Sequence, residues 1–178
     1  MSTAAVRVAA ESGLWLYVRG LERLMAMPAE VVERALLVDE APEPDWPEPR
    51  PIEAPHGCLG RLVVRGAAYG AWDLGRLLGG EAAHRSWILL RLPRGGQTYP
   101  VALRADECLH VGALPPGRRL ELPPGTLRGR AVFRAAFPAA EARGAHGRGA
   151  LVGFEMDPGA LFGDDELEIT RALARLDV

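Results

Sequence analysis

The sequence contains no lysine, and all 21 of its basic residues are arginine. A GC-rich genome accounts for such a bias, so the bias alone does not indicate an arginine-based recognition surface. The formal net charge is −2, whereas nucleic-acid-binding proteins usually carry a basic patch and a clear basic excess. We therefore expect no nucleic-acid partner.

Cysteine and long apolar runs are also scarce. The chain has two cysteines, Cys58 and Cys108, which do not imply a disulfide framework. No apolar run approaches the roughly 18 residues of a membrane-spanning helix, and no N-terminal stretch has the pattern of a secretion signal. We therefore expect no direct membrane insertion and a cytoplasmic location.

Motifs for catalysis and for metal or cofactor binding are missing or incomplete. There is no Gly-x-Ser-x-Gly elbow, and Ser86, close to His84, lies in an apolar strand pattern. The glycines of 147–153 lack the dinucleotide-binding spacing and lead into a strand. Four residues are of types that bind zinc: His56, Cys58, Cys108 and His110. Their i, i+2 spacing is narrower than that of usual zinc ligand pairs, so we expect no metal, no cofactor and no catalytic residues.

Short apolar segments separated by turn residues dominate the chain. Residues 14–20 and 23–28 predict a hairpin, and the apolar spacing of 29–37 predicts a short helix after Pro28. A second helix is predicted near the C-terminus, from Asp164. Further strands are predicted over 61–65, 67–72, 86–92, 98–105, 107–114, 119–124, 130–137 and 150–157. This spacing favours a sandwich or barrel over βαβ units.

Two local features suggest how the chain is divided. Residues 41–56 contain six prolines and should form an extended connector, with Trp46 and Ile52 as its anchors to the body. Asp73 suits the N-cap of a short helical turn, and Gly79 suits its end, so both are expected to be structural. We predict a flexible start over 1–13, one domain of two halves over 14–173 with a junction near residue 80, and a tail over 174–178.

Four stretches follow one another in a characteristic order. The first three are "LYVRGLERLMAMPAEVVERALL", the proline-rich "PEPRPIEAPHGCLGRLVVRG" and "RGAAYGAWDLGRLLG", and the last is "ALVGFEMDPGALFGDDEL". In this order they resemble the CheW-like family, the bacterial chemotaxis coupling proteins. The resemblance extends from about Leu14 to about Leu173.

The resemblance implies a mainly β fold of two intertwined, SH3-like, five-stranded barrels with short helices. It also implies a non-catalytic adaptor that couples the cytoplasmic tip of a chemoreceptor to the regulatory domain of a CheA-type histidine kinase. Arg65 matches the family's partner-contacting arginine, and Gly66 would shape its turn. Apolar residues near it are weaker candidates for the partner-binding surface: Val63, Ala67 and Tyr69.

The sequence departs from the family pattern at two positions. Val63 stands where the family commonly has asparagine, and Gly70 stands near its usual proline. A divergent coupler that serves a dedicated signalling system therefore fits as well as a general chemotaxis coupler. The alternative from another class is a small all-β enzyme or ligand-binding barrel, with its site between the two halves.

Overall fold

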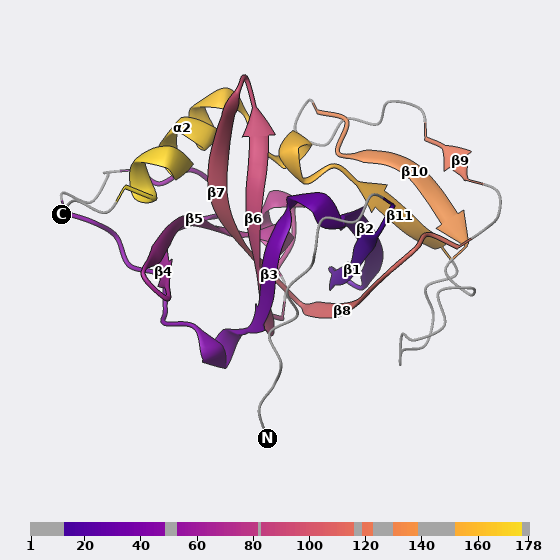
Figure 1. The fold of residues 1–178 in the computed structure, drawn as a ribbon, viewed down its shortest axis with the longest axis horizontal. Coiled ribbons are helices and arrows are strands. Elements are labelled where there is room, and N and C mark those ends of the chain that lie inside the picture. Colours follow the sequence, from indigo (N-terminus) through magenta and orange to yellow (C-terminus); the bar gives the residue numbers. More distant parts are fainter. Residues whose placement is uncertain are drawn as a thin grey trace.

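The computed structural model describes residues 13–48, 53–81, 83–115, 119–122, 130–138 and 152–175, and it contains two β-sheets and a few short helices (Figure 1). The first sheet has the order β8 (Glu107–Gly112), β1 (Trp15–Gly20), β2 (Arg23–Pro28), β11 (Val152–Met156), β10 (Phe133–Pro138) and β9 (Leu120–Glu121). The second has the order β3 (Val32–Leu37), β6 (Ser86–Arg94), β7 (Gln97–Ala105), β5 (Ala67–Asp73) and β4 (Cys58–Val64).

The two sheets are intertwined along the chain. The chain starts the first sheet with β1 and β2, builds the whole second sheet with β3 to β7, and returns to the first sheet from β8 onward. Most neighbouring strands are antiparallel, but β2–β11 and β5–β7 are parallel pairs that join segments far apart in sequence. The predicted mainly β fold in two intertwined halves is thus confirmed.

The expected closure of each sheet into a five-stranded barrel is not observed. Among the described strands, no pairing joins β8 to β9 or β3 to β4, and the first sheet has six strands. In the described part of the segment between β3 and β4, one isolated bridge forms, from Asp45 to Arg61. The neighbouring Pro44 and Pro47 lack the backbone N–H that a continuous ladder would need.

The predicted helix over 29–37 is wrong beyond its first turn. Only the 3₁₀ helix η1 (Ala29–Val31) forms, and Val32–Leu37 is the strand β3, paired with β6. Val32 and Leu36 are both buried but in different apolar clusters, because the register shifts between Val32 and Arg34. Such a bulge changes which face of the sheet the following side chains occupy. The buried residues of β3 therefore do not alternate strictly, and their spacing resembled that of a helix.

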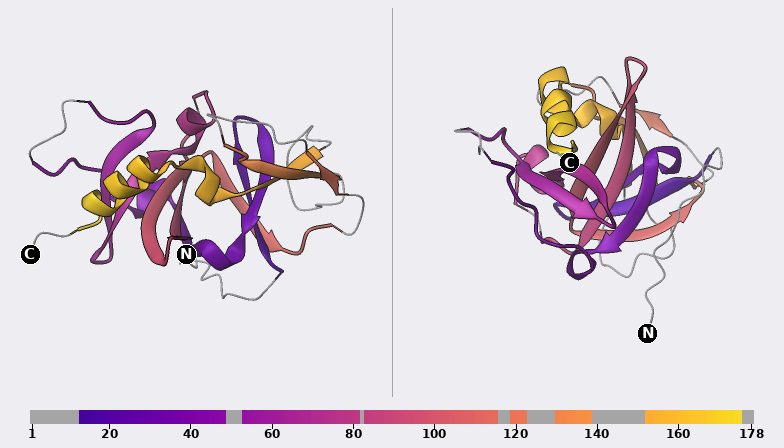
Figure 2. Two further views of the ribbon diagram at one scale, coloured as in Figure 1. Left: turned by 90° about the horizontal axis from the view of Figure 1, so that it is seen from above. Right: turned by 60° about the vertical axis from the view of Figure 1, so that its left-hand side comes forward.

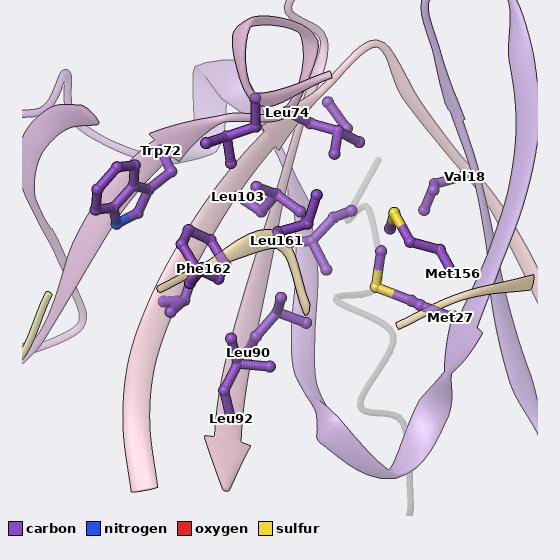
Figure 3. Packing of buried hydrophobic residues seen from close by; sticks show 14 of the residues in the cluster. Val18, Met27, Trp72, Leu74, Leu90, Leu92, Leu103, Met156, Leu161 and Phe162 are labelled. Atoms are coloured by element: carbon purple, nitrogen blue, oxygen red, sulfur yellow. The ribbon is translucent and has the colours of Figure 1, made fainter. Parts of the chain in front are cut away.

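The largest apolar cluster joins the two halves (Figure 3). Val18, Met27 and Met156 enter it from the first sheet. Trp72, Leu90, Leu92 and Leu103 enter it from the second sheet, and Leu161 and Phe162 from the C-terminal segment. The Phe162 ring packs edge-on against Trp72, with centroids 5.3 Å apart. Burial of these side chains makes the two halves share one core.

The C-terminal helix α2 (Asp164–Leu173) packs against β5 and β7 of the second sheet (Figure 2). It comes so close to β5 that a Cβ atom added to Gly70 would lie 2.8 Å from the Thr170 Cα. Glycine at this position is therefore explained by close packing of a helix on a strand. The other helical segments are α1 (Leu74–Leu77) and the 3₁₀ helices η2 (Val38–Glu40) and η4 (Pro158–Leu161).

Two further expectations concern the connector and membrane spans. Trp46 is partly buried against the main core cluster, as expected of an anchor. Ile52, the other expected anchor, lies outside the described residues. None of the helices in the described ranges combines the length and the apolarity that crossing a bilayer requires.

Candidate partner-binding site

Arg65 and Gly66 form the tight turn between β4 and β5. Their φ angles are +50° and +81°, so both residues have left-handed backbone conformations. Positive φ at both central positions is the requirement of a type I′ hairpin turn, in which asparagine followed by glycine is preferred. Arginine at the first position adopts this conformation at a cost of about 1 kcal/mol. The turn holds the Arg65 side chain at the exposed end of the hairpin.

A groove of about 130 Å³ lies next to this turn. One side of the groove is formed by β3, η2 and the residue Pro42 that follows η2, and the other side by β4 and the turn. The lining residues are Arg34, Leu36, Glu40, Pro42, Val63, Val64 and Arg65. Leu36 and Val64 belong to the apolar cluster inside the second sheet, and each is 8% exposed. The two free edges of the second sheet thus border a common groove with an apolar lining.

The lining of this groove carries two arginines and one glutamate, so its net charge is positive. Among the described residues, neither Arg34 nor Arg65 forms an ion pair. Glu40 is engaged locally, since its Oε2 accepts a hydrogen bond from the Leu37 N–H at 2.9 Å. Two arginines beside an apolar floor suit a partner that presents carboxylates next to an apolar side chain.

Comparison with known proteins identifies the architecture. No protein-family model matches the sequence, and no curated protein matches it. A crystal structure of the scaffolding protein TtCheW from Thermoanaerobacter tengcongensis aligns with a TM-score of 0.57, over 84% of this chain and 92% of that chain. The fold is CheW-like. The sequence identity of 16% makes this a likeness of fold, and the roles of individual residues rest on the geometry of this chain.

Val63 and Tyr69, both predicted near the partner-binding surface, differ in how far they are buried in this CheW-like fold. Val63 is half-buried and lines the groove. Tyr69 does not lie on an open surface, since it is 2% exposed and belongs to the cluster inside the second sheet. Its hydroxyl donates to Glu33 Oε2 at 3.1 Å, and Arg91 Nε donates to the same oxygen at 2.8 Å. Burial and the Glu33 charge raise the pKa of the Tyr69 phenol, which stays protonated in this cluster.

Asp73 and Gly79 bracket the short helix α1. Asp73 Oδ1 accepts the Arg76 N–H at 3.0 Å, and Gly79 follows the helix with a φ of +89°. The structure adds two partners for the fully buried Asp73 carboxylate: His84 Nε2 lies 3.3 Å and Arg104 Nη2 lies 3.5 Å from Oδ2. This cluster has no signature in the sequence, because no local spacing relates Asp73, His84 and Arg104.

The residues of zinc-binding type have separate structural environments. Burial raises the pKa of the Cys58 thiol to about 11 and that of the Cys108 thiol to about 12, which disfavours the thiolates. His56 lies 3.1 Å from the Arg76 carbonyl oxygen, and the His110 ring stacks on Tyr17 with centroids 4.5 Å apart. In the described ranges, no three His, Cys, Asp or Glu residues are arranged to hold a metal ion.

A second hollow, of about 210 Å³, lies where the two sheets meet η4. Trp15, Val31 and Leu92 are among its apolar lining residues, and Arg134 and Asp157 are among its charged ones. Sites for small molecules usually have volumes of about 300–1,000 Å³. Arg134 and Asp157 already form an ion pair with each other. This hollow therefore does not favour the alternative of an enzyme or ligand-binding barrel.

Proposed function

We propose that this protein is a non-catalytic cytoplasmic scaffold in a bacterial chemosensory pathway. In this role it joins the regulatory domain of a CheA-type histidine kinase to the cytoplasmic tip of a chemoreceptor. The CheW-like fold supports this class of function, and TtCheW is itself described as a scaffolding protein. Arg65, Gly66 and Val63 are the residues that we assign to partner binding.

The observation that carries the proposal is the state of Arg65. Its side chain is exposed and has no ion-pair partner among the described residues, although its backbone is held in a conformation that arginine rarely adopts. Leu21 and Glu22 have equally strained φ angles, so it is the exposure of Arg65, its lack of an ion pair among the described residues and its place beside the groove that single it out. A guanidinium in this place can donate two parallel hydrogen bonds to a partner carboxylate.

The mechanism of such a scaffold is positional. It holds receptor and kinase in one assembly, and its contacts contribute binding free energy that differs between the kinase-on and kinase-off arrangements. A protein that binds one arrangement more tightly shifts the equilibrium toward it by that difference in affinity. No chemical step is required of the scaffold, so its residues act through their binding energies.

The test is calorimetric titration of the purified protein with the regulatory domain of the histidine kinase encoded next to it. We expect binding, and we expect Arg65→Asn to weaken it at least tenfold, the loss of about one charge-assisted hydrogen bond. Asparagine suits the first position of this turn, so the variant should retain its melting temperature.

Arg23→Gln is the matched control, because Arg23 is exposed, has no ion pair among the described residues and lies on the first sheet. It should bind as the unmodified protein does. Absence of binding at tens of micromolar to the kinase domain and to the receptor tip would refute the scaffold function. Unchanged affinity of Arg65→Asn would refute the role of Arg65.

A further inference from the structure

The outer edge of β4 has backbone groups available for pairing. Asp45 and Arg61 exchange two backbone hydrogen bonds across this edge, at 2.8 and 2.6 Å, so the N–H and C=O of Arg61 point away from β5. Backbone groups of successive residues in a strand alternate between its two sides. The next outward-facing groups are therefore those of Val63, and in the described part of the chain Asp45 is the only residue that pairs on this side of β4.

The groove beside this edge can receive a side chain. Leu36 on β3 and Val64 on β4 line it from within the apolar cluster of the second sheet. β3 is the opposite edge strand of the same sheet, so the groove marks the seam at which the sheet fails to close. A strand laid along β4 would place an apolar side chain over this floor.

The charge around the seam favours an acidic added strand over a basic one. Arg34 and Arg65 flank the floor without ion-pair partners among the described residues, and Glu40 is the single carboxylate of the lining, so the lining is net positive. An acidic segment would place carboxylates beside both guanidinium groups, and a basic one would be repelled. A helix could not pair with the outward backbone groups of Val63, because its own backbone donors and acceptors are used internally.

We infer that the seam between β3 and β4 binds an extended, acidic segment of the partner protein that adds a strand at Val63 and places one apolar side chain between Leu36 and Val64. Main-chain hydrogen bonds give such strand addition its affinity, and the pocket and charges give it specificity. The inference rests on the proposed scaffold function and states how the partner is held.

The experiment is amide hydrogen exchange, measured by NMR on the full chain alone and in complex with the kinase regulatory domain. In the free protein the Val63 amide should exchange quickly although it lies inside a strand, while the Leu62 and Val64 amides, which face β5, should be protected. In the complex, exchange at Val63 should slow at least tenfold.

A substitution provides a second readout. Val63→Pro removes the outward N–H and no β4–β5 hydrogen bond, a placement that edge strands tolerate. It should weaken partner binding at least tenfold, and clearly more than Val63→Thr, which keeps the N–H. Hydrogen exchange decides the matter if the proline variant does not fold.

The outcomes separate the two proposals. Binding without slower exchange at Val63 would overturn strand addition and leave the scaffold function standing. Absence of binding would overturn the scaffold function and this inference with it. A third result would be that exchange at the Val63 amide slows in the protein alone as its concentration rises. That result would identify a second copy of this chain as the occupant and overturn the assignment to a partner.

Discussion

The indole Nε1 of Trp72 donates a buried hydrogen bond to Thr170 Oγ1 at 2.9 Å and so ties the C-terminal helix α2 to β5. Both residues are fully buried, and the Thr170 hydroxyl in turn donates to the Glu166 carbonyl at 2.9 Å. The indole N–H of a buried tryptophan needs such an acceptor. The contact joins residues 98 positions apart in sequence and fixes the helix over the second sheet.

We predict that Thr170→Val lowers the free energy of unfolding by about 1–3 kcal/mol, because valine keeps the shape but leaves the Trp72 N–H buried without an acceptor. Urea unfolding measures this loss. Ala172 lies exposed on the same helix, and Ala172→Ser is the control, expected to change stability by less than about 0.5 kcal/mol. Equal effects of the two substitutions would contradict the role of the hydrogen bond.

Gly70→Ala should destabilise the protein by about 1–3 kcal/mol, since the added Cβ would meet the Thr170 backbone at 2.8 Å. Thermal unfolding provides the measurement. Gly112→Ala is the matched control, because a Cβ there would have no contact closer than 3.6 Å and its φ is not positive. If Gly70→Ala left the stability unchanged, α2 could move away from the sheet at little cost in free energy.

The turn between β1 and β2 shows how much a left-handed backbone conformation costs in stability at a place to which we assign no partner binding. Leu21 and Glu22 have φ angles of +52° and +61°, as strained as that of Arg65. Glu22→Gly should therefore raise the free energy of unfolding by up to about 1 kcal/mol and leave partner affinity unchanged. Chemical denaturation and calorimetry give the two numbers. A loss of affinity would place this turn in the interface as well.

Asp73→Ala should cost about 3 kcal/mol or more, because it removes the α1 cap and leaves the poorly exposed Arg104 guanidinium without its buried partner. Denaturant unfolding measures the change. Asp39→Ala, at an exposed position, is the control and should change stability by less than about 0.5 kcal/mol. A loss near 1 kcal/mol would indicate that only the cap matters.

Stability should decline at alkaline pH through Cys58. Burial raises the pKa of its thiol from an ordinary value of 9.0 to about 11, so above pH 9 the unfolded chain releases a proton that the folded chain keeps. Stability from this group is complete below pH 9 and is lost as the pH rises toward 11. The loss amounts to about 2 kcal/mol by about pH 10.5. Denaturant titrations across this range should show a shallower pH dependence for Cys58→Ala, and equal slopes would refute the assignment.

The sequence predicted most strands from local patterns, and the Arg65-Gly66 turn with them. The strand at 86–92 was recognised because it is strongly apolar, and its residues 87–90 are buried in the structure as part of β6. The segment 29–37 was predicted as a helix because a bulge in β3 interrupts the alternation of its buried side chains. A bulge cannot be recognised from apolar spacing alone. Tyr69 was a candidate for the partner-binding surface because it lies close to Arg65 in sequence, but its side chain points into the cluster inside the second sheet.

The sequence by itself determined the mainly β class, the succession of strand segments along the chain and the position of the turn residues, because these depend on side-chain alternation and local backbone preferences. The tertiary structure alone decided which strands are edges, that Gly70 lies under Thr170 and that Arg65 borders a groove with Arg34. These relationships join residues that are distant along the chain. They depend on packing and pairing between elements, which local preferences do not encode.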